Sequence, residues 1–359
     1  MDGSTSAACT PRTPAWRLAA LYAPIADELA RSRQILHDEL ISDQGFISDL
    51  CRHVDQFHGK LLRPAVLLLA ARAAGNLRPE HAVLGAVVEL VHIATLLHDD
   101  VLDEADIRRR AATVNRLWGN HRAVLMGDFL YSHAFHLCSS LDARRLCRGV
   151  DGQYAARLVG QTAVTVCEGE MMQVARRGDF DLSEADYLDI IRRKTAGLVE
   201  TCCQLGAAFA GAEDATVRRL RHYGRNVGLA FQIVDDLLDL TGEECEVGKS
   251  LGRDVHEGEV TLPIIHSLRS GAAEQRARLS ALLRNGHAPA DTPAPRPTGD
   301  SQRHREIATL LRASASIAYA ERVAREHVQA ARTALAELPP SPARDSLDTL
   351  AEFVLARRQ

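Results

Sequence analysis

The sequence predicts an all-α fold, a single domain in which helices pack around a central cavity. Apolar residues recur with helical spacing along almost the whole chain, and no alternating strand pattern of useful length interrupts them. Aromatic residues make up only 4% of the composition, and Ala, Leu, Arg and Glu are abundant, which favours helix. With 359 residues, 46% of them hydrophobic, the chain is long enough to bury a sizeable core.

The elements follow in order along the chain. Residues 1–14 carry Pro, Ser, Thr and charge and lack the apolar run of a signal peptide, so we expect a disordered tail. Residues 15–359 form the predicted domain, and within it "RNGHAPADTPAPRPTGDSQRHRE" (284–306) is polar and Pro-rich, which predicts a mobile surface loop. Helical periodicity predicts helices at 15–40, 43–57, 60–75, 79–105, 120–147, 150–176, 183–210, 213–242, 258–285, 304–336 and 341–357.

Composition excludes several classes of protein. The net charge of -4 gives no general attraction to nucleic acid. Eight cysteines without a CxxC pair indicate neither a zinc site nor a disulfide framework, so we expect a cytoplasmic protein. The most apolar stretch, 82–97, is too short to span a membrane and contains Glu89 and His92. We therefore expect a buried core helix there and no membrane anchor.

Two acidic clusters carry the strongest signal. In "LLHDDVLDEADIRRR" (96–110), Asp99 and Asp103 are four residues apart and share one helical face, which Asp106 would continue. The DDxxD pattern returns in "FQIVDDLLDL" (231–240), at Asp235, Asp236 and Asp239, inside an apolar helix. Carboxylates in such surroundings must be paired or coordinate a metal, and Mg²⁺ binds one or two carboxylates together with phosphate oxygens. The clusters therefore predict two Mg²⁺ sites.

Lysine is rare and marks anion sites. Of the 43 basic residues only Lys60, Lys194 and Lys249 are lysines, in "GKLLRP", "RRKTA" and "GKSLGRD". Arg63 is three residues after Lys60, which predicts that both lie on one helical face, and Arg108 and Arg109 follow the first acidic cluster. A phosphate-rich substrate bound with Mg²⁺ satisfies both the acidic and the basic groups.

The ordered motifs resemble those of the trans-isoprenyl diphosphate (polyprenyl) synthases. They are "GKLLRP", "HDDVLDEADIRRR", "VLMGDFLYSHAF", "GEMMQ", "KTA", "FQIVDDLLD", "GKSLGRD" and "EGEVTLP", and they cover most of the chain. The resemblance implies an isoprenoid-synthase-type helical bundle, a homodimer, and Mg²⁺-dependent condensation of isopentenyl diphosphate onto an allylic diphosphate. Released diphosphate would be the second product.

The resemblance also assigns roles to residues. Asp99, Asp103, Asp235 and Asp239 would hold Mg²⁺, and the first three, with Lys194, are the expected catalytic residues. The isopentenyl diphosphate would be bound by Lys60, Arg63, His92 and Arg109. The allylic diphosphate would be bound by Arg108, Lys194, Thr195, Gln232 and Lys249.

Two positions depart from the family pattern. Arg110 stands where glycine is common, which would alter the loop after the first cluster. Glu259, in "EGEVTLP", stands where many members place a lysine, so one contact to the allylic diphosphate is in doubt.

Product length depends on the residues before the first cluster. Thr95 and Ala94 lie four and five positions before Asp99, and Val91 lies one turn further back. None of the three has a bulky aromatic side chain that would plug the tunnel. In the resembling family, small residues at these positions accompany longer products, so we expect the C30–C50 class. Phe129, Phe135 or Phe209 could block the tunnel instead, so a C20 product remains an alternative.

Three other functions are weighed against this one. A class I terpene cyclase needs no site for a second diphosphate, so Lys60, Arg63 and Arg109 count against it. A di-iron bundle needs paired ExxH motifs, of which only Glu89–His92 is present. A non-catalytic subunit of a heteromeric synthase would be expected to have lost acidic-cluster residues, whereas all six Asp are present here.

Overall fold

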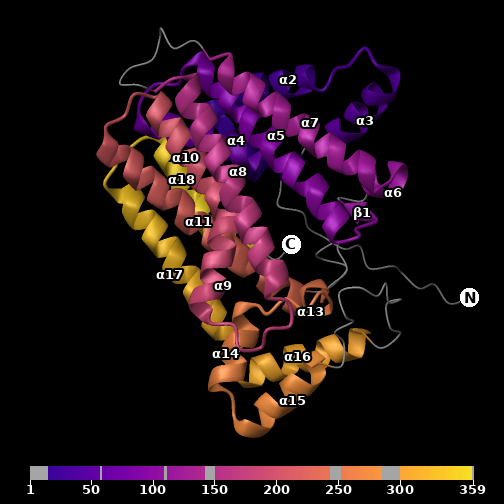
Figure 1. The fold of residues 1–359 in the computed structure, drawn as a ribbon. Helices are drawn as coiled ribbons and strands as arrows, with labels where there is room; N and C mark the ends of the chain where they lie inside the picture. The colour runs from indigo at the N-terminus through magenta and orange to yellow at the C-terminus, as the bar shows by residue number, and fades with distance from the viewer. Residues whose placement is uncertain are drawn as a thin grey trace, which may run out of the picture.

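Helices make up almost the entire structure, a computed structural model that describes residues 15–56, 59–108, 111–141, 150–242, 252–284 and 300–357 (Figure 1). The predicted all-α class is confirmed. A two-residue antiparallel pair, β1 (Ile107–Arg108) and β2 (Ala111–Ala112), accompanies the helices. The helices are α1 (Ala15–Tyr22), η1 (Ala23–Ile25), α2 (Ala26–Glu39), α3 (Gly45–Asp55), α4 (Leu62–Ala74), α5 (Pro79–Leu102), α6 (Val114–Trp118), α7 (Asn120–Ser139), α8 (Gly152–Ala175), α9 (Glu184–Ile191), η3 (Arg192–Ala196), α10 (Gly197–Phe209), α11 (Asp214–Thr241), α13 (Arg253–His256), α14 (Leu262–Ser270), α15 (Ala273–Arg284), α16 (Asp300–Ala313), α17 (Ser316–Ala336) and α18 (Pro342–Ala356).

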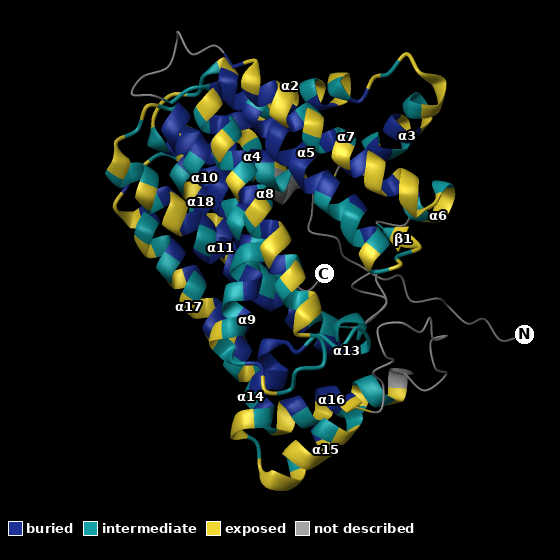
Figure 2. Ribbon diagram, viewed as in Figure 1, coloured by how far each residue is buried: buried dark blue, intermediate teal, exposed yellow. Residues whose placement is uncertain are grey.

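The core runs through the middle of the bundle. Helix α5 packs against α2, α4 and α7, while α10 packs between α4 and α11, and α17 covers the other side of α11. Buried leucines such as Leu67, Leu84 and Leu205 fill these contacts. Figure 2 shows buried residues, in dark blue, concentrated on the helices of this part of the bundle. Both acidic clusters lie toward the C-terminal ends of core helices, α5 and α11. The core therefore fixes the direction in which each cluster faces.

Helix α5 is buried as the sequence predicts. By length and composition it could cross a membrane, but 78% of its most apolar stretch is buried inside the protein. Core helices of folded domains commonly meet such a test, because they are apolar on every face.

Several predicted helix boundaries were wrong. The helix expected at 258–285 is two helices, α14 and α15, and the one expected at 304–336 is α16 and α17. Between the latter two, Ala315 adopts a φ of 54°, a left-handed conformation that no sequence signal predicts for alanine. The loop expected at 284–306 is shorter at both ends, because α15 runs to Arg284 and α16 begins at Asp300. Residues 285–299, like the tail at 1–14, lie outside the described part of the chain.

Candidate active site

The first acidic cluster lies at the C-terminal end of α5. The backbone N–H of Asp103 donates to the carbonyl of Asp99 at 2.8 Å, so the helical pattern continues and both carboxylates share one face, as predicted. The chain then turns at Glu104, whose φ is 48°. Asp106 therefore leaves this face and is exposed, and the expectation that it would extend the cluster is wrong.

Asp99 is a carboxylate that needs a cation. Its pKa is raised to about 7, mainly by burial and also by the neighbouring charges of Glu170 and Asp103, against the opposing effect of Lys194 and Arg108. Within the described residues no three His, Cys, Asp or Glu side chains come close enough to hold an ion by themselves. Mg²⁺ commonly takes one or two carboxylates and completes its shell with water and phosphate. The donor set at Asp99 and Asp103 fits that mode of binding.

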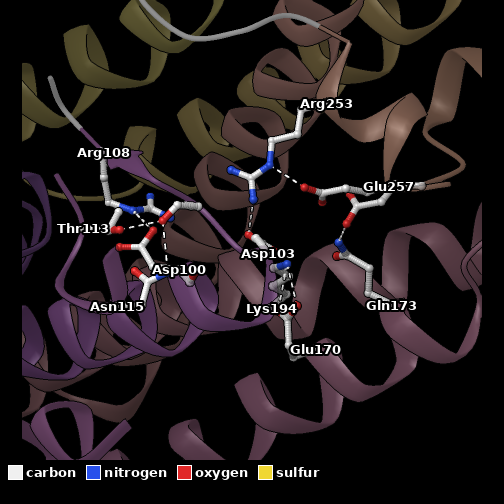
Figure 3. Close-up of polar contacts among 12 residues, drawn as sticks. Asp100, Asp103, Arg108, Thr113, Asn115, Glu170, Gln173, Lys194, Arg253 and Glu257 are labelled. Carbon is white, nitrogen blue, oxygen red and sulfur yellow. Dashed lines mark hydrogen bonds and ion pairs between the residues drawn. The ribbon is translucent and has the colours of Figure 1, made fainter. Parts of the chain in front are cut away.

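Asp100, between the two, has a structural role. It is almost fully buried, and its Oδ1 accepts from Arg108 Nε at 2.6 Å (Figure 3). The Asn115 side chain donates to the carbonyl oxygens of Asp100 and Ala105, each at 3.1 Å. These contacts fix the loop after α5 and hold Arg108, a predicted diphosphate ligand, beside the first cluster.

The second cluster is organised by a chain of hydrogen bonds. Asp236 is buried and accepts from Tyr187 at 2.6 Å and from Gln232 at 2.7 Å. Thr195 in turn donates to Gln232 at 2.7 Å. Burial raises the pKa of Asp236 to about 8. These hydrogen bonds bring together Thr195 and Gln232, both predicted to bind the allylic diphosphate.

The two outer carboxylates of this cluster already have partners. Asp235 Oδ1 lies 3.2 Å from Arg357 Nη2, and the Arg357 guanidinium stacks over the Phe231 ring at 4.0 Å. Asp239 accepts from the backbone N–H groups of Arg253 at 3.3 Å and Asp254 at 3.1 Å. Asp239 thus anchors the start of α13, a use of this residue that the motif alone does not reveal.

Arg253 joins the two clusters. Its backbone N–H donates to Asp239, while its side-chain Nη2 lies 2.5 Å from Asp103 Oδ2 (Figure 3). One residue therefore contacts both acidic motifs, although 136 positions separate Asp103 from Asp239 in the sequence. Asp103 and Asp239 therefore border the same part of the structure.

Lys194 projects from a π-helical segment, η3, between α8 and α11. Glycines permit the close packing: a Cβ at Gly169 would lie 2.6 Å from the Lys194 backbone N, and one at Gly228 would lie 2.5 Å from Ala196 Cα. Lys194 Nζ lies 2.8 Å from Glu170 Oε2. Burial alone would lower its pKa, but Glu259, Glu170 and Asp99 outweigh burial and raise it. Lys194 is therefore a fixed positive charge at neutral pH.

Three of the four residues predicted to bind isopentenyl diphosphate lie at the N-terminal end of α4 and in the middle of α5. Lys60 precedes α4 and is exposed, because Leu61 adopts a left-handed φ of 48° and the helix begins at Leu62. The argument that Lys60 and Arg63 share a helical face was therefore wrong. Arg63 is half-buried in the first turn of α4, and His92 is buried on α5. Arg109, Arg110 and Lys249 lie outside the described residues.

The structure adds site residues that sequence reasoning left without a role. Glu170 and Gln173 belong to the quoted "GEMMQ" motif, and Gln173 donates to Glu259. Arg177 lies 3.8 Å from Asp103, and Arg357 pairs with Asp235. In the sequence, only the "GEMMQ" motif could have indicated a role for Glu170 and Gln173. Arginines are so numerous in this chain that composition singles out neither Arg177 nor Arg357.

Comparison with known proteins agrees with this geometry. The polyprenyl synthetase family profile matches residues 44–293. The chain is 33% identical to octaprenyl diphosphate synthase of Escherichia coli over 334 residues, which cover 92% of this chain and 96% of that protein. It is 37% identical to nonaprenyl diphosphate synthase of Mycobacterium tuberculosis over 342 residues, 94% and 95% of the two chains.

Solved structures give the same result. The crystal structure of a polyprenyl synthase from Caulobacter crescentus, complexed with calcium and isoprenyl diphosphate, superposes with a TM-score of 0.83 at 32% identity, over 95% of this chain and 98% of that one. Sequence, fold and the two facing acidic clusters lead to one conclusion. The chain belongs to the polyprenyl synthetase family of trans-prenyltransferases.

Proposed function

We propose that the protein is a Mg²⁺-dependent synthase that condenses isopentenyl diphosphate head-to-tail onto an allylic diphosphate and releases diphosphate. The observation that carries this proposal is the contact of Arg253 with both acidic clusters, because it requires Asp103 and Asp239 to border the same space. A site with carboxylates on two sides and Lys194 beside them suits a substrate diphosphate bound through metal ions.

The side chains of the site would act mainly by stabilising the negative charge of the diphosphate. Mg²⁺, when bound by Asp99, Asp103 and Asp235, would neutralise the negative charge that develops on the leaving diphosphate. Lys194 would stabilise the same charge, because its raised pKa keeps it protonated. Thr195 and Gln232, fixed by the hydrogen-bond chain to Asp236, would orient the allylic diphosphate. The double bond of isopentenyl diphosphate supplies the electron pair for the new C–C bond, so no protein nucleophile is required.

The product we propose is a long polyprenyl diphosphate of the C40–C50 class. Octaprenyl and nonaprenyl synthases are among the relatives reported above. In the structure, Val91 and Ala94 are buried on α5, and Thr95 is half-buried with its hydroxyl donating to the His92 carbonyl at 2.7 Å. None of the three is bulky enough to act as an aromatic plug.

The aromatic residues named as alternative plugs lie in different places. Phe135 is 38% exposed, and Phe129 packs against His133 in a tilted arrangement with ring centroids 4.3 Å apart. Phe209 is fully buried but packs 6.5 Å from the His81 ring, near the N-terminal end of α5. His81 is 18 positions from Asp99, about 27 Å along the helix. On this spacing, a plug at Phe209 would stop only a chain that extends about 27 Å from Asp99.

We further propose a cytoplasmic homodimer. Exposed apolar side chains gather on the neighbouring helices α7 and α8: Val124, Leu125, Phe135, Val164, Met171 and Val174. A second copy of the chain would cover such a surface.

The function is tested with purified protein, Mg²⁺, isopentenyl diphosphate and a farnesyl diphosphate primer, followed by mass analysis of the products. Elongation supports the proposal. Absence of elongation with dimethylallyl, geranyl, farnesyl and geranylgeranyl primers would overturn it, and would favour a subunit that requires a catalytic partner.

A further inference from the structure

The loop between α13 and α14 carries an acid at Glu259, where the resembling family commonly has a lysine. The Glu259 side chain is half-buried and accepts a hydrogen bond from Gln173 on α8. The nearby positive charge of Lys194 acts on this carboxyl group and favours its ionised form. This position therefore lacks a cation and has a carboxyl group instead beside the expected diphosphate site.

Two arginines lie on the same side of the site. Arg253 comes six residues before Glu259, and its guanidinium contacts Asp103 Oδ2 through Nη2 and Glu257 Oε1 through Nε, each at 2.5 Å (Figure 3). Arg177 follows the end of α8, with its Nη2 3.8 Å from Asp103 Oδ1 and 4.0 Å from Glu257 Oε2. A backbone hydrogen bond from Gly178 to Gly258, at 2.8 Å, ties the two segments together.

Not every hydrogen-bond donor of the Arg177 guanidinium has an acceptor. Its Nε is buried and has no hydrogen-bond acceptor among the described residues, and the two carboxylate oxygens near its Nη2 lie beyond hydrogen-bond distance. A buried guanidinium donor without an acceptor is costly. Such a group is matched by an anion with several oxygens, and a diphosphate presents oxygens to arginine in paired geometry.

We propose that Arg253 and Arg177 bind the diphosphate of the allylic substrate in place of the lysine that Glu259 replaces. Without substrate they neutralise Asp103. When Asp103 binds metal, their guanidinium groups turn to the phosphate oxygens. This assignment rests on the proposed function, since it requires a metal-bound diphosphate at Asp103.

The test is calorimetric titration of the full chain with farnesyl thiolodiphosphate, a poorly reactive allylic analogue, in the presence of Mg²⁺. Three variants are compared with the parent: Arg253→Gln, Arg177→Gln, and the double variant Arg253→Gln/Glu259→Lys. Arg176→Gln is the matched control, because Arg176 is exposed and pairs with Asp179 at 2.7 Å, away from the site.

Each single change at the site should weaken analogue binding about tenfold or more, the effect of losing charged hydrogen bonds. The double variant should recover most of that loss, because the Glu259→Lys change returns a cation to the family position, and Arg176→Gln should bind like the parent. Unchanged or tighter binding by Arg253→Gln and Arg177→Gln, or no recovery in the double variant, would show that these arginines only hold the loops together.

Thermal unfolding of each variant separates lost binding from lost folding. If Arg253→Gln unfolds, Arg177→Gln still decides the question, because its carboxylate contacts are too long to stabilise the fold strongly. The outcome is also separable from the proposed function. A parent protein that elongates isoprenoids while both single variants bind normally would refute only the arginine assignment. A parent that binds the analogue through these arginines but never elongates would refute only the proposed function.

Discussion

Asp99 and Asp106 were both assigned to the first acidic cluster, but the structure separates them. Asp99 is half-buried with a raised pKa, whereas Asp106 is exposed and only 3.6 Å from the exposed Arg116. Asp99→Asn should lower kcat by about 10²–10³ through loss of metal-assisted charge stabilisation, with no fall in thermal midpoint. Asp106→Asn is the control and should keep parent activity. Equal effects of the two changes in a steady-state assay would contradict the assignment of Asp99.

Glu259 predicts a pH effect on stability. Burial raises its pKa from the usual 4.5 to about 7. A carboxyl group with a raised folded pKa stabilises the protein below its unfolded pKa, and that contribution is lost as pH rises through the folded value. The parent should therefore lose stability relative to Glu259→Gln between pH 4.5 and 7. Urea unfolding of both proteins on either side of that window, in acetate and in a mildly alkaline buffer, measures the change. A difference independent of pH would mean that folding does not shift the pKa of Glu259.

At the residue scale, the sequence predicted which residues share a helical face better than it predicted contacts between distant segments. The DDxxD spacing correctly placed Asp99 and Asp103 on one face, because i and i+4 residues meet on any helix. It could not show that Asp239 caps α13 or that Arg253 reaches Asp103, because those contacts join segments far apart in sequence. Lys60 was misplaced for a local reason, the left-handed conformation of Leu61.

Among the elements, the π-helical segment η3 depends on two glycines. A methyl group at Gly228 would lie 2.8 Å from the Ala196 Cβ, as well as against its Cα, so α11 and η3 would have to separate. We expect Gly228→Ala to cost about 1–3 kcal/mol of stability, the usual range for overpacking, and to weaken binding by moving Thr195. Gly45→Ala is the control, since nothing lies within 4 Å of a Cβ there. Matching thermal midpoints for the two variants would contradict this account of the packing.

Helix α5 sets product length in the proposed function. Thr95 is half-buried, so a larger side chain can be accommodated there with little disturbance of the core. Thr95→Phe should shorten the product to C20 or less, read by mass, while Ile41→Phe, at an exposed position, should leave product length unchanged. Parent-length products from Thr95→Phe would place the growing chain on another face of α5.

Element boundaries were predictable where a cap or proline marks them. Ser183 accepts from the Asp186 backbone at 3.0 Å at the start of α9, close to the predicted start at 183, and Pro263 lies in the first turn of α14. The break between α14 and α15 at Gly271, and the short helix α13, were missed. Short apolar segments carry too little periodicity to separate one helix from two.

For the whole molecule, the sequence predicted the fold class and the family because eight ordered motifs span most of the chain. It could not predict how apolar residues distribute between core and surface.

The exposed patch on α7 and α8 supports the proposed dimer, and Met171, 63% exposed, lies within it. Met171→Asp should shift the protein toward monomer in sedimentation velocity, whereas Ile41→Asp should not. A monomeric parent would refute the dimer.

The measurement that tests the central claim most directly is the mass of the products formed from isopentenyl and farnesyl diphosphates with Mg²⁺. The account predicts polyprenyl diphosphates of C40–C50, formed only with the divalent ion and abolished by chelation. No elongation, or elongation that survives both chelation and Asp99→Asn, would contradict it.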